Sequence, residues 1–284
     1  MLVALDTGGC RVEARRGLEP GLWRCPLCAG TVFLKRGARK IAHFAHAARL
    51  DCPLSGEGEV HLSVKLGLVE HLRALGWVCE PEVALDPTRI VDVLAVRPGD
   101  RARLAIEIQA SPISVAEMDR RVTVDGGHGV TTGWLFTEGR LAASAPALVP
   151  ALLGVEPLPL QLRLPPEVIH LHRRYRCGIF VAASPGKEPG RPSLQVARLE
   201  LGAAWTPARL DGVYRPPHRL RATLRLTRVE WLQTPRLELA EGRADGDDTV
   251  IFTADTVDSP PSSAGLAAAH DRDERGPGLA YSFP

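Results

Sequence analysis

Five side chains of metal-binding type lie within one short stretch of the sequence. Cys25 and Cys28 form a CxxC pair, His43 and His46 form an HxxH pair, and Cys52 follows them. Zinc takes four thiolate or imidazole ligands in a tetrahedron, and a CxxC turn supplies two of them from one knuckle. The fourteen residues between the two pairs allow a hairpin that returns to the metal. Three candidates remain for the other two positions, so the spacing leaves open which one is not a ligand.

The alternative interpretation is that these cysteines are ordinary buried thiols and that the histidines pack in a core. We favour structural zinc, because clustered CxxC and HxxH pairs seldom arise otherwise in a reducing compartment. In such a compartment the six cysteines of the chain do not indicate disulfides. With every coordination position filled by protein, the zinc ion would be structural and not catalytic.

A second group of ionisable side chains, Glu57, His61 and Lys65, recurs at intervals of four residues. The surrounding segment has the signature of a helix, for which Ser55 is the predicted N-cap and Gly76 the predicted exit. The three ionisable groups then share one side of that helix. Burying them is unfavourable unless they are paired, hydrated or bound to a ligand. The alternative is an i, i+4 ladder on a solvated helix face.

Two carboxylates lie in the strands of a predicted β-hairpin that turns at residues 98–100. Asp92 belongs to the first strand, and Glu107 belongs to the second, where it shares a face with Gln109. Acidic groups on neighbouring strands repel each other unless a cation lies between them. Hard oxygen ligands with open water positions suit Mg²⁺ or Mn²⁺. Such an ion lowers the pKa of a bound water and neutralises charge on a phosphodiester.

Composition places the chain among ordinary folded proteins. Of its 284 residues, 45% are hydrophobic and 24% are charged, which is typical of a globular chain and not of a fibrous or disordered one. The sequence has no basic leader followed by an apolar run and no uninterrupted apolar stretch of about 18 residues. We therefore expect a cytoplasmic protein that does not insert into a membrane.

The net charge of +2 hides an uneven distribution along the chain. Residues 167–238 carry thirteen Lys or Arg against six Asp or Glu, whereas residues 241–284 carry three against nine. The first segment predicts a basic strand around residues 219–232, whose outer side is either a phosphate-binding surface or an ordinary solvated face. The second is rich in Asp, Gly, Ser and Pro, so we expect a disordered acidic tail.

Several short motifs occur together and in one order: CPLC, HFAH, EGEVHLSVK, RIVDV, AIEIQAS followed by PIS, and GWLF. With these motifs, roughly residues 1–140 resemble the competence protein CoiA-like family, whose core is similar to a PD-(D/E)xK nuclease. The resemblance implies an α/β (α+β) fold with a restriction-endonuclease-like αβββαβ core. It also implies a small zinc-ribbon-like β module before that core, and we expect a β-rich region after it.

The resemblance further implies roles for particular residues. Asp92 and Glu107 would hold the catalytic Mg²⁺ or Mn²⁺, and Glu57 would add a further carboxylate. Gln109 stands where the motif usually has lysine, and an amide orients a water without supplying positive charge. Lys65 on the predicted helix is our candidate for the missing cation.

Two roles remain open after this assignment. Arg121 is a second candidate for the cation, and it follows a predicted capping box formed by Ser114 and Glu117. His61 is either a general acid or base or a hydrogen-bonded structural histidine.

The expected organisation has four segments. They are a zinc-binding module at 1–55, a nuclease-like domain at 56–150, a basic β-rich region at 167–240 and the acidic tail at 241–284. The leading interpretation is a divalent-metal-dependent nuclease that hydrolyses DNA in uptake, recombination or defence, with recombination or competence proteins as partners. The alternative is a catalytically inactive, nuclease-fold DNA-binding accessory protein. A zinc-ribbon transcription factor is disfavoured, because the charged strand pair would then have no function.

Overall fold

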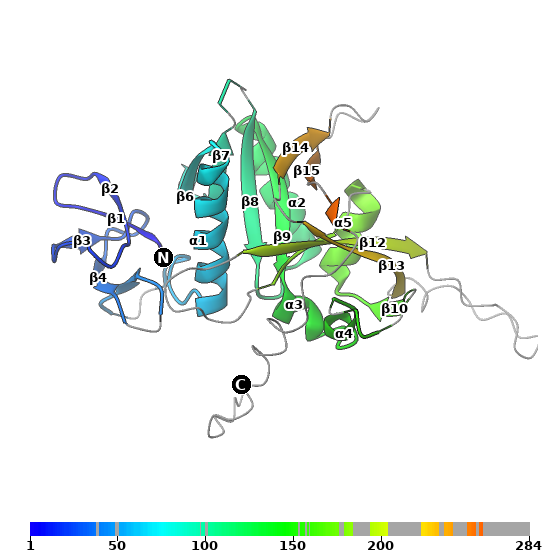
Figure 1. The fold of residues 1–284 in the computed structure, drawn as a ribbon. Helices are drawn as coiled ribbons and strands as arrows, with labels where there is room; N and C mark the ends of the chain where they lie inside the picture. Colours follow the sequence, from blue (N-terminus) through cyan, green and yellow to red (C-terminus); the bar gives the residue numbers. More distant parts are fainter. Residues whose placement is uncertain are drawn as a thin grey trace, which may run out of the picture.

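A computed structural model describes residues 1–37, 40–48, 51–96, 98–99, 102–152, 154–156, 158, 160–175, 179–183, 194–203, 223–232, 236–240, 249–253 and 256–257. The chain is a mixed α+β protein with a small N-terminal sheet beside a large one (Figure 1). None of the helices among these residues is long and apolar enough to cross a membrane.

The N-terminal sheet has the strand order β2-β1-β3-β4-β5. Its strands are β1 (Val3–Leu5), β2 (Arg11–Glu13), β3 (Trp23–Arg24), β4 (Thr31–Lys35) and β5 (His43–His46). The sheet curls, so that β5 returns to the start of the chain, where the Phe44 N–H donates to the Met1 carbonyl at 2.9 Å. Trp23 and Phe44 pack inside with ring centroids 5.6 Å apart. These residues form a compact core for a module of only about 55 residues.

The nuclease-like region has the predicted αβββαβ order. Its elements are α1 (Glu59–Ala74), β6 (Val78–Asp86), β7 (Arg89–Val96), β8 (Arg103–Gln109), α2 (Val115–Gly127) and β9 (Val130–Thr137). Strands β6, β7 and β8 are antiparallel neighbours, and β9 lies parallel to β8. A parallel pair needs a crossover connection, and α2 supplies it.

The large sheet continues beyond β9 into the second half of the chain, in the order β10-β13-β12-β11-β9-β8-β7-β6, with β16 beside β13. The added elements are α3 (Glu138–Ala142), α4 (Leu148–Leu152), β10 (Leu160–Arg163), α5 (Pro166–Tyr175), β11 (Ile179–Ala183), β12 (Gln195–Ala203), β13 (Thr223–Leu232) and β16 (Thr256–Val257). Strands β14 (Arg236–Ala240) and β15 (Thr249–Thr253) form a separate pair. Segment 167–240 is therefore built on the same sheet as the nuclease-like region.

Several sequence-based expectations for the second half concern residues that the structure describes only in part. The basic strand forms as β13 over residues 223–232, while residues 219–222 lie outside the described residues. Within the acidic tail, β15 and β16 are strands where we expected disorder. The other residues of 241–284 are outside the described part.

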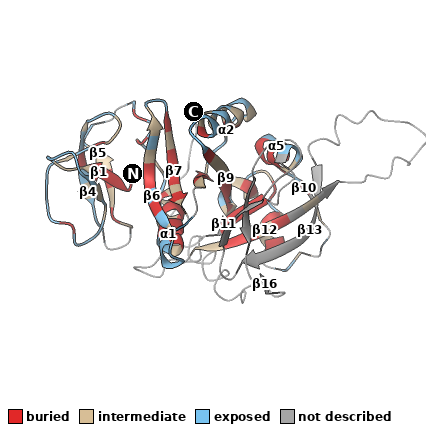
Figure 2. Ribbon diagram, turned by 90° about the horizontal axis from the view of Figure 1, so that it is seen from above, coloured by how far each residue is buried: buried red, intermediate tan, exposed pale blue. Residues whose placement is uncertain are grey.

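Helices cover both faces of the large sheet. Figure 2 shows α1 on one side and α2 with α5 on the other. Neighbouring positions of β9 alternate between the two cores, because Leu135 packs with Leu68 and Leu72 of α1, whereas Trp134 and Phe136 pack with the helices on the opposite face. This alternation is the period-2 pattern of a strand buried on both sides.

The ends of α1 and α2 can be compared with the predicted capping residues. Ser55 does not cap α1, since the helix begins at Glu59 and its N-cap is Gly58, which has no side-chain cap bond. Gly76 does follow the end of α1, with a φ of +85° that favours glycine. The capping box of α2 is confirmed in its first half, because the Ser114 hydroxyl accepts from the Glu117 N–H at 3.1 Å.

The N-terminal module docks on β6 through specific polar contacts. The Leu2 and Val3 N–H groups donate to the two carboxylate oxygens of Glu82 at 2.6 and 3.0 Å. Arg11 donates to the carbonyl oxygens of Pro81 and Glu82. Because these bonds join residues 70–80 positions apart in the chain, they fix the module against the edge strand of the large sheet.

Candidate active site and metal centre

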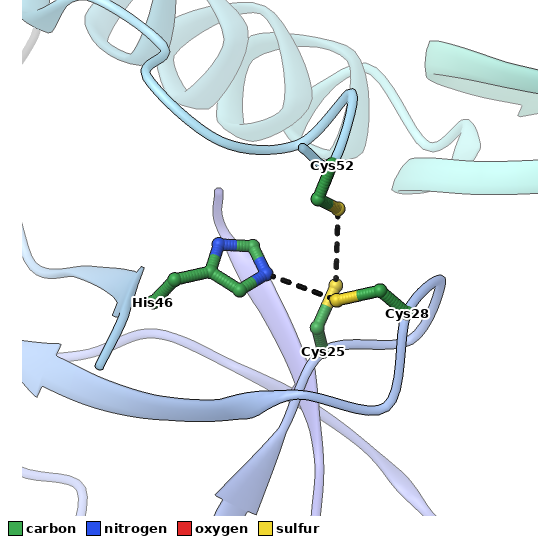
Figure 3. A group of neighbouring side chains, drawn as sticks. All are labelled: Cys25, Cys28, His46 and Cys52. Atoms are coloured by element: carbon green, nitrogen blue, oxygen red, sulfur yellow. Dashed lines mark hydrogen bonds between the residues drawn. The ribbon is translucent and has the colours of Figure 1, made fainter. Parts of the chain in front are cut away.

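Four of the five predicted zinc ligands converge. Ligand atoms of Cys25, Cys28, His46 and Cys52 all lie within 4.8 Å of one another, and Figure 3 shows their side chains pointing toward a common centre. The Cys25 and Cys52 sulfurs are 3.8 Å apart, and the His46 Nε2 lies 3.3 Å from the Cys28 sulfur. His43 is outside this group and places its Nδ1 3.0 Å from the Ile41 carbonyl oxygen.

The knuckle between β3 and β4 explains how two cysteines converge. Ala29 adopts a φ of +53°, which reverses the chain, and the Cys25 N–H bonds the Gly30 carbonyl at 2.8 Å. Burial raises the pKa of the Cys52 thiol to about 12, and the neighbouring Cys25 adds to this rise. Thiols grouped in this way are favourable as thiolates only beside a cation, and three sulfurs with one imidazole suit a closed zinc site.

The second group lies where α1 meets β7. Ligand atoms of Glu57, His61 and Asp92 lie within 4.8 Å of one another. The His61 Nε2 is 2.9 Å from the Asp92 Oδ1 and 3.3 Å from the Glu57 Oε1. His61 occupies the first turns of α1, and Glu57 lies just before the helix. Two carboxylates and an imidazole can hold a divalent metal ion together.

Lys65 completes this cluster from the next turn of α1. Its ammonium group is fully buried, lies 3.0 Å from the Asp92 Oδ1 and also contacts Glu57. Burial acts to lower the pKa of Lys65, but the carboxylates of Asp92, Glu82 and Glu57 outweigh it and raise that pKa above its ordinary value. The group therefore stays charged at neutral pH.

Glu82 is a member of the cluster that the sequence analysis missed. Its Oε1 lies 3.2 Å from the Lys65 Nζ, and the same carboxylate accepts the Leu2 and Val3 N–H groups described above. Glu82 has a φ of +55°, a strained conformation for a residue with a side chain. The available signal was an acidic residue directly after Pro81, which gave little distinction in a strand that also contains Glu80 and Asp86.

Asp92 and Glu107 lie next to each other but point to different cations. The β7–β8 ladder pairs Val93 with Ile106, and one step further along it come the two acidic residues. The Asp92 N–H donates to the Glu107 Oε1 at 3.4 Å, and the Ile108 N–H donates to the Asp92 Oδ2 at 2.9 Å. Whereas Asp92 faces α1, Glu107 is outside the group that Glu57, His61 and Asp92 form.

Two family models cover most of the first 149 residues. The model described as "Competence protein CoiA, N-terminal domain" matches residues 11–55, and the one described as "Competence protein CoiA, nuclease-like domain" matches residues 57–149. Both matches support a CoiA-like competence protein family. Searches of curated proteins and of solved structures gave no match. Within this CoiA-like chain, all four converging zinc-type ligands fall in the first match, and the α1–β7–β8 cluster falls in the nuclease-like match.

The nuclease-like domain of this CoiA-like chain holds Glu107 between two guanidinium groups. Arg89 Nη2 lies 2.9 Å from the Glu107 Oε1, and Arg121 Nη1 lies 2.5 Å from its Oε2. Arg89 also pairs with Asp125 of α2 at 2.7 Å. Arg89 and Asp125 were not predicted to have a role. Their only signals in the sequence are a charged residue at the start of a mostly apolar strand and another in the last turn of a helix.

Electrostatics distinguish the two acidic residues of this CoiA-like site. Burial acts to raise the pKa of Asp92, but Lys65 and His61 outweigh it and hold that pKa well below its ordinary value. For Glu107, burial and then the charge of Asp92 raise the pKa, and Arg89 and Arg121 oppose that rise. Asp92 is 17% exposed and Glu107 is 2% exposed, so a metal ion would reach Asp92 more easily.

Two other predicted residues take defined positions near the site. Gln109 is buried, and its amide donates to the Ser111 carbonyl. Arg121 bridges Glu107 and Glu117, the latter at 2.9 Å, so it is closer to Glu107 than to the Lys65 cluster. Of the two candidate cations, Lys65 pairs with Asp92 and Arg121 pairs with Glu107.

Proposed function

We propose that this CoiA-like chain is a divalent-metal-dependent nuclease that hydrolyses DNA phosphodiester bonds. The observation that carries the proposal is the group of Glu57, His61 and Asp92 with the charged Lys65 beside it, in an αβββαβ core. Three ligands that converge on one point, and that leave positions for water, suit Mg²⁺ or Mn²⁺.

In this proposal Asp92 and Glu57 hold the ion from β7 and from the start of α1. The ion would supply Lewis-acid chemistry, lowering the pKa of a bound water and neutralising charge on the phosphodiester. Lys65 supplies fixed positive charge for the phosphorane-like transition state, which an amide at Gln109 cannot supply. His61 either completes the ligand set or accepts a proton from the attacking water, since its Nε2 faces both carboxylates.

Glu107 has a supporting role in the same proposal. Its carboxylate accepts the Asp92 N–H and forms ion pairs with Arg89 and Arg121. A second mode, in which Glu107 turns toward the metal ion, would require the 29% exposed Arg121 side chain to move and the buried ion pair with Arg89 to break. Zinc at the N-terminal cluster is structural in this proposal, and the protein acts in the cytoplasm with recombination or competence proteins as partners.

A second candidate function is a non-cleaving DNA-binding accessory protein. The observation that favours it is the complete pairing of Glu107 by two arginines, which neutralises this carboxylate without a metal ion. In that case the buried charges maintain the fold and do no chemistry.

Labelled single- and double-stranded DNA, incubated with the protein in Mg²⁺, in Mn²⁺ and without added metal, separates the two functions. We expect metal-dependent cleavage, and we expect Asp92→Asn to lower its rate about a hundredfold or more. Asp86→Asn is the matched control, since Asp86 lies at the β6–β7 turn and pairs with His128 at 3.0 Å, away from the cluster. DNA retention without cutting in either metal would support the accessory function instead.

A further inference from the structure

One side of the N-terminal sheet exposes an aromatic ring. Strand β4 alternates, so that Val32 points into the module while Phe33 points out. Phe33 is 58% exposed, whereas Phe44 on the neighbouring strand is 1% exposed and belongs to the core. Folding does not account for the exposed ring, because water and not protein covers more than half of it.

Cations lie beside this ring on the same side of the sheet. Lys35 is two residues from Phe33 on β4, so both point outward. The ladders pair Phe33 with Ala45, Lys35 with His43 and Arg24 with Thr31. We call the surface made by Arg24, Phe33, Lys35, His43 and Ala45 the Phe33 face.

The Phe33 face carries positive charge that the described residues do not neutralise. Both Arg24 and Lys35 are exposed, and neither has an ion-pair partner among the residues that the structure describes. Residues 1–55 contain nine Lys or Arg and four Asp or Glu, whereas residues 56–166 contain ten and fourteen. A basic module thus sits on an acidic core, and an anionic polymer would be attracted to the module.

A cavity begins at one end of this face. It has a volume of about 370 Å³, and its lining includes Lys35, His43, Ala45 and Glu57. This volume is within the range of about 300–1,000 Å³ typical of small-ligand sites. The cross-strand pair Lys35–His43, next to the exposed ring, therefore lines the same cavity as Glu57 of the candidate active site.

We propose that the Phe33 face binds single-stranded DNA. A base stacks on Phe33, Arg24 and Lys35 contact phosphates, and the strand passes His43 toward the cavity that Glu57 lines. Binding at the face is independent of catalysis, whereas delivery of the strand to the metal cluster rests on the proposed function.

Chemistry favours a single strand over a duplex at this face. Proteins that hold single strands without sequence preference combine aromatic side chains, on which bases stack, with a cationic track for the backbone. In a duplex the bases already stack on one another, so a side-chain ring on an open sheet surface has no free base to contact. Duplex DNA would use Arg24 and Lys35 but would gain little from Phe33.

Fluorescence anisotropy with labelled oligo-dT of about 16 nucleotides, without added divalent metal, tests the binding step in the full chain. We expect Phe33→Ala to weaken binding roughly tenfold and Phe33→Tyr to retain it. Replacing both Arg24 and Lys35 with glutamine should make the slope of log K against log salt shallower by about 1.4. Val155→Ala, at a 73% exposed apolar residue outside the module, is the matched control.

Several outcomes would overturn the proposal. Among these are equal affinity of Phe33→Ala and the unaltered protein for oligo-dT, and an equal loss of affinity in the Val155 control. Binding of a matched duplex that Phe33→Ala weakens as strongly would also reject it, since stacking on an unpaired base would then not be the cause. Tighter binding of oligo-U than of oligo-dT would assign the face to RNA and would likewise overturn it. Zinc content and circular dichroism of each variant show that the module is still folded.

A cleavage arm separates this proposal from the proposed nuclease activity. Asp92→Asn should retain oligo-dT binding while it loses cutting, whereas Phe33→Ala should weaken both at low DNA concentration and cut normally at saturating DNA. If no variant cuts and Phe33→Ala still weakens binding, the nuclease proposal fails and the single-strand surface stands.

Discussion

Replacement of Lys65 by methionine is the sharpest test of the buried charge cluster. The substitution keeps the length of the side chain and removes its ammonium group, which is fully buried among Glu57, Glu82 and Asp92. The three carboxylates would then repel one another inside the protein. Removal of one partner from a buried ion pair typically costs about 3–5 kcal/mol, and we expect the free energy of unfolding to fall by that amount at pH 7.

The loss of folding stability in Lys65→Met should depend on pH. In the unaltered protein the pKa values of Asp92 and Glu57 lie below their ordinary values, because Lys65 outweighs the effect of burial. These groups therefore stabilise the fold above about pH 4, and that stability is lost as the pH falls. Without Lys65 their pKa values rise, so the variant loses less stability on acidification. The difference between the two proteins should be largest near pH 7 and should narrow toward pH 4.

Urea unfolding followed by circular dichroism at several pH values measures this difference. With an m-value of about 2–3 kcal/mol/M, the expected loss moves the midpoint by roughly 1–2.5 M. Arg120→Met on α2 is the control, because Arg120 makes a partly exposed pair with Glu117 and such pairs contribute less than about 1 kcal/mol. The double variant with Asp92→Asn should recover part of the stability, since one of the three carboxylates is then neutral.

A Lys65→Met protein that matches the unaltered protein within about 1 kcal/mol at pH 7 would refute the reasoning. Strict additivity of Lys65→Met and Asp92→Asn would do the same, because it would mean that the two groups do not interact.

Two further predictions concern the metal centre and α2. His46→Ala should lower both the bound zinc measured by mass spectrometry and the melting temperature. His43→Ala should leave both unchanged, since His46 and not His43 lies with the three cysteines. Equal losses in the two variants would contradict the ligand set. Hydrogen bonds from Arg120, and then from Arg121, lower the pKa of Glu117 to about 2. Ionised Glu117 should therefore stabilise the fold above about pH 4.5, and this stabilisation should be lost as the pH falls toward 2. Glu117→Gln should flatten the stability profile over that interval, and an unchanged profile would count against the assignment.

Much of the core was predictable because the relevant signals are local. The alternation of apolar residues in β7 and β8, the capping serine of α2 and the positive-φ Gly76 all depend on near neighbours in the sequence. Spacing of four residues likewise predicted that His61 and Lys65 share one side of α1, and Glu57, which lies just before the helix, contacts both of them. Ser55 was assigned wrongly as the cap, because Gly58 occupies that position without a side-chain bond.

The rest of the site depends on contacts between distant segments. Glu82 reaches Lys65 only because β6 pairs with β7 and adopts a left-handed backbone there, and Arg89 reaches Asp125 across 36 positions of the chain. Nor could the spacing alone decide between His43 and His46. They are three residues apart on β5 and point to opposite faces, and only the pairing with β4 shows that His46 shares the face of the buried Val32. Such choices are made by tertiary packing, which a one-dimensional pattern does not contain.

The position of β9 inside the large sheet has a practical consequence for anyone who shortens this chain. On one side β9 bonds β8, and on the other Leu135, Phe136 and Thr137 stand opposite Phe180, Val181 and Ala182 of β11. A fragment that stopped at residue 149, where the family match ends, would lack β11. The edge of β9 would then be unpaired and its apolar side chains exposed. Such edges recruit other strands and promote aggregation, so the matched half should be insoluble when expressed without β11 and β12.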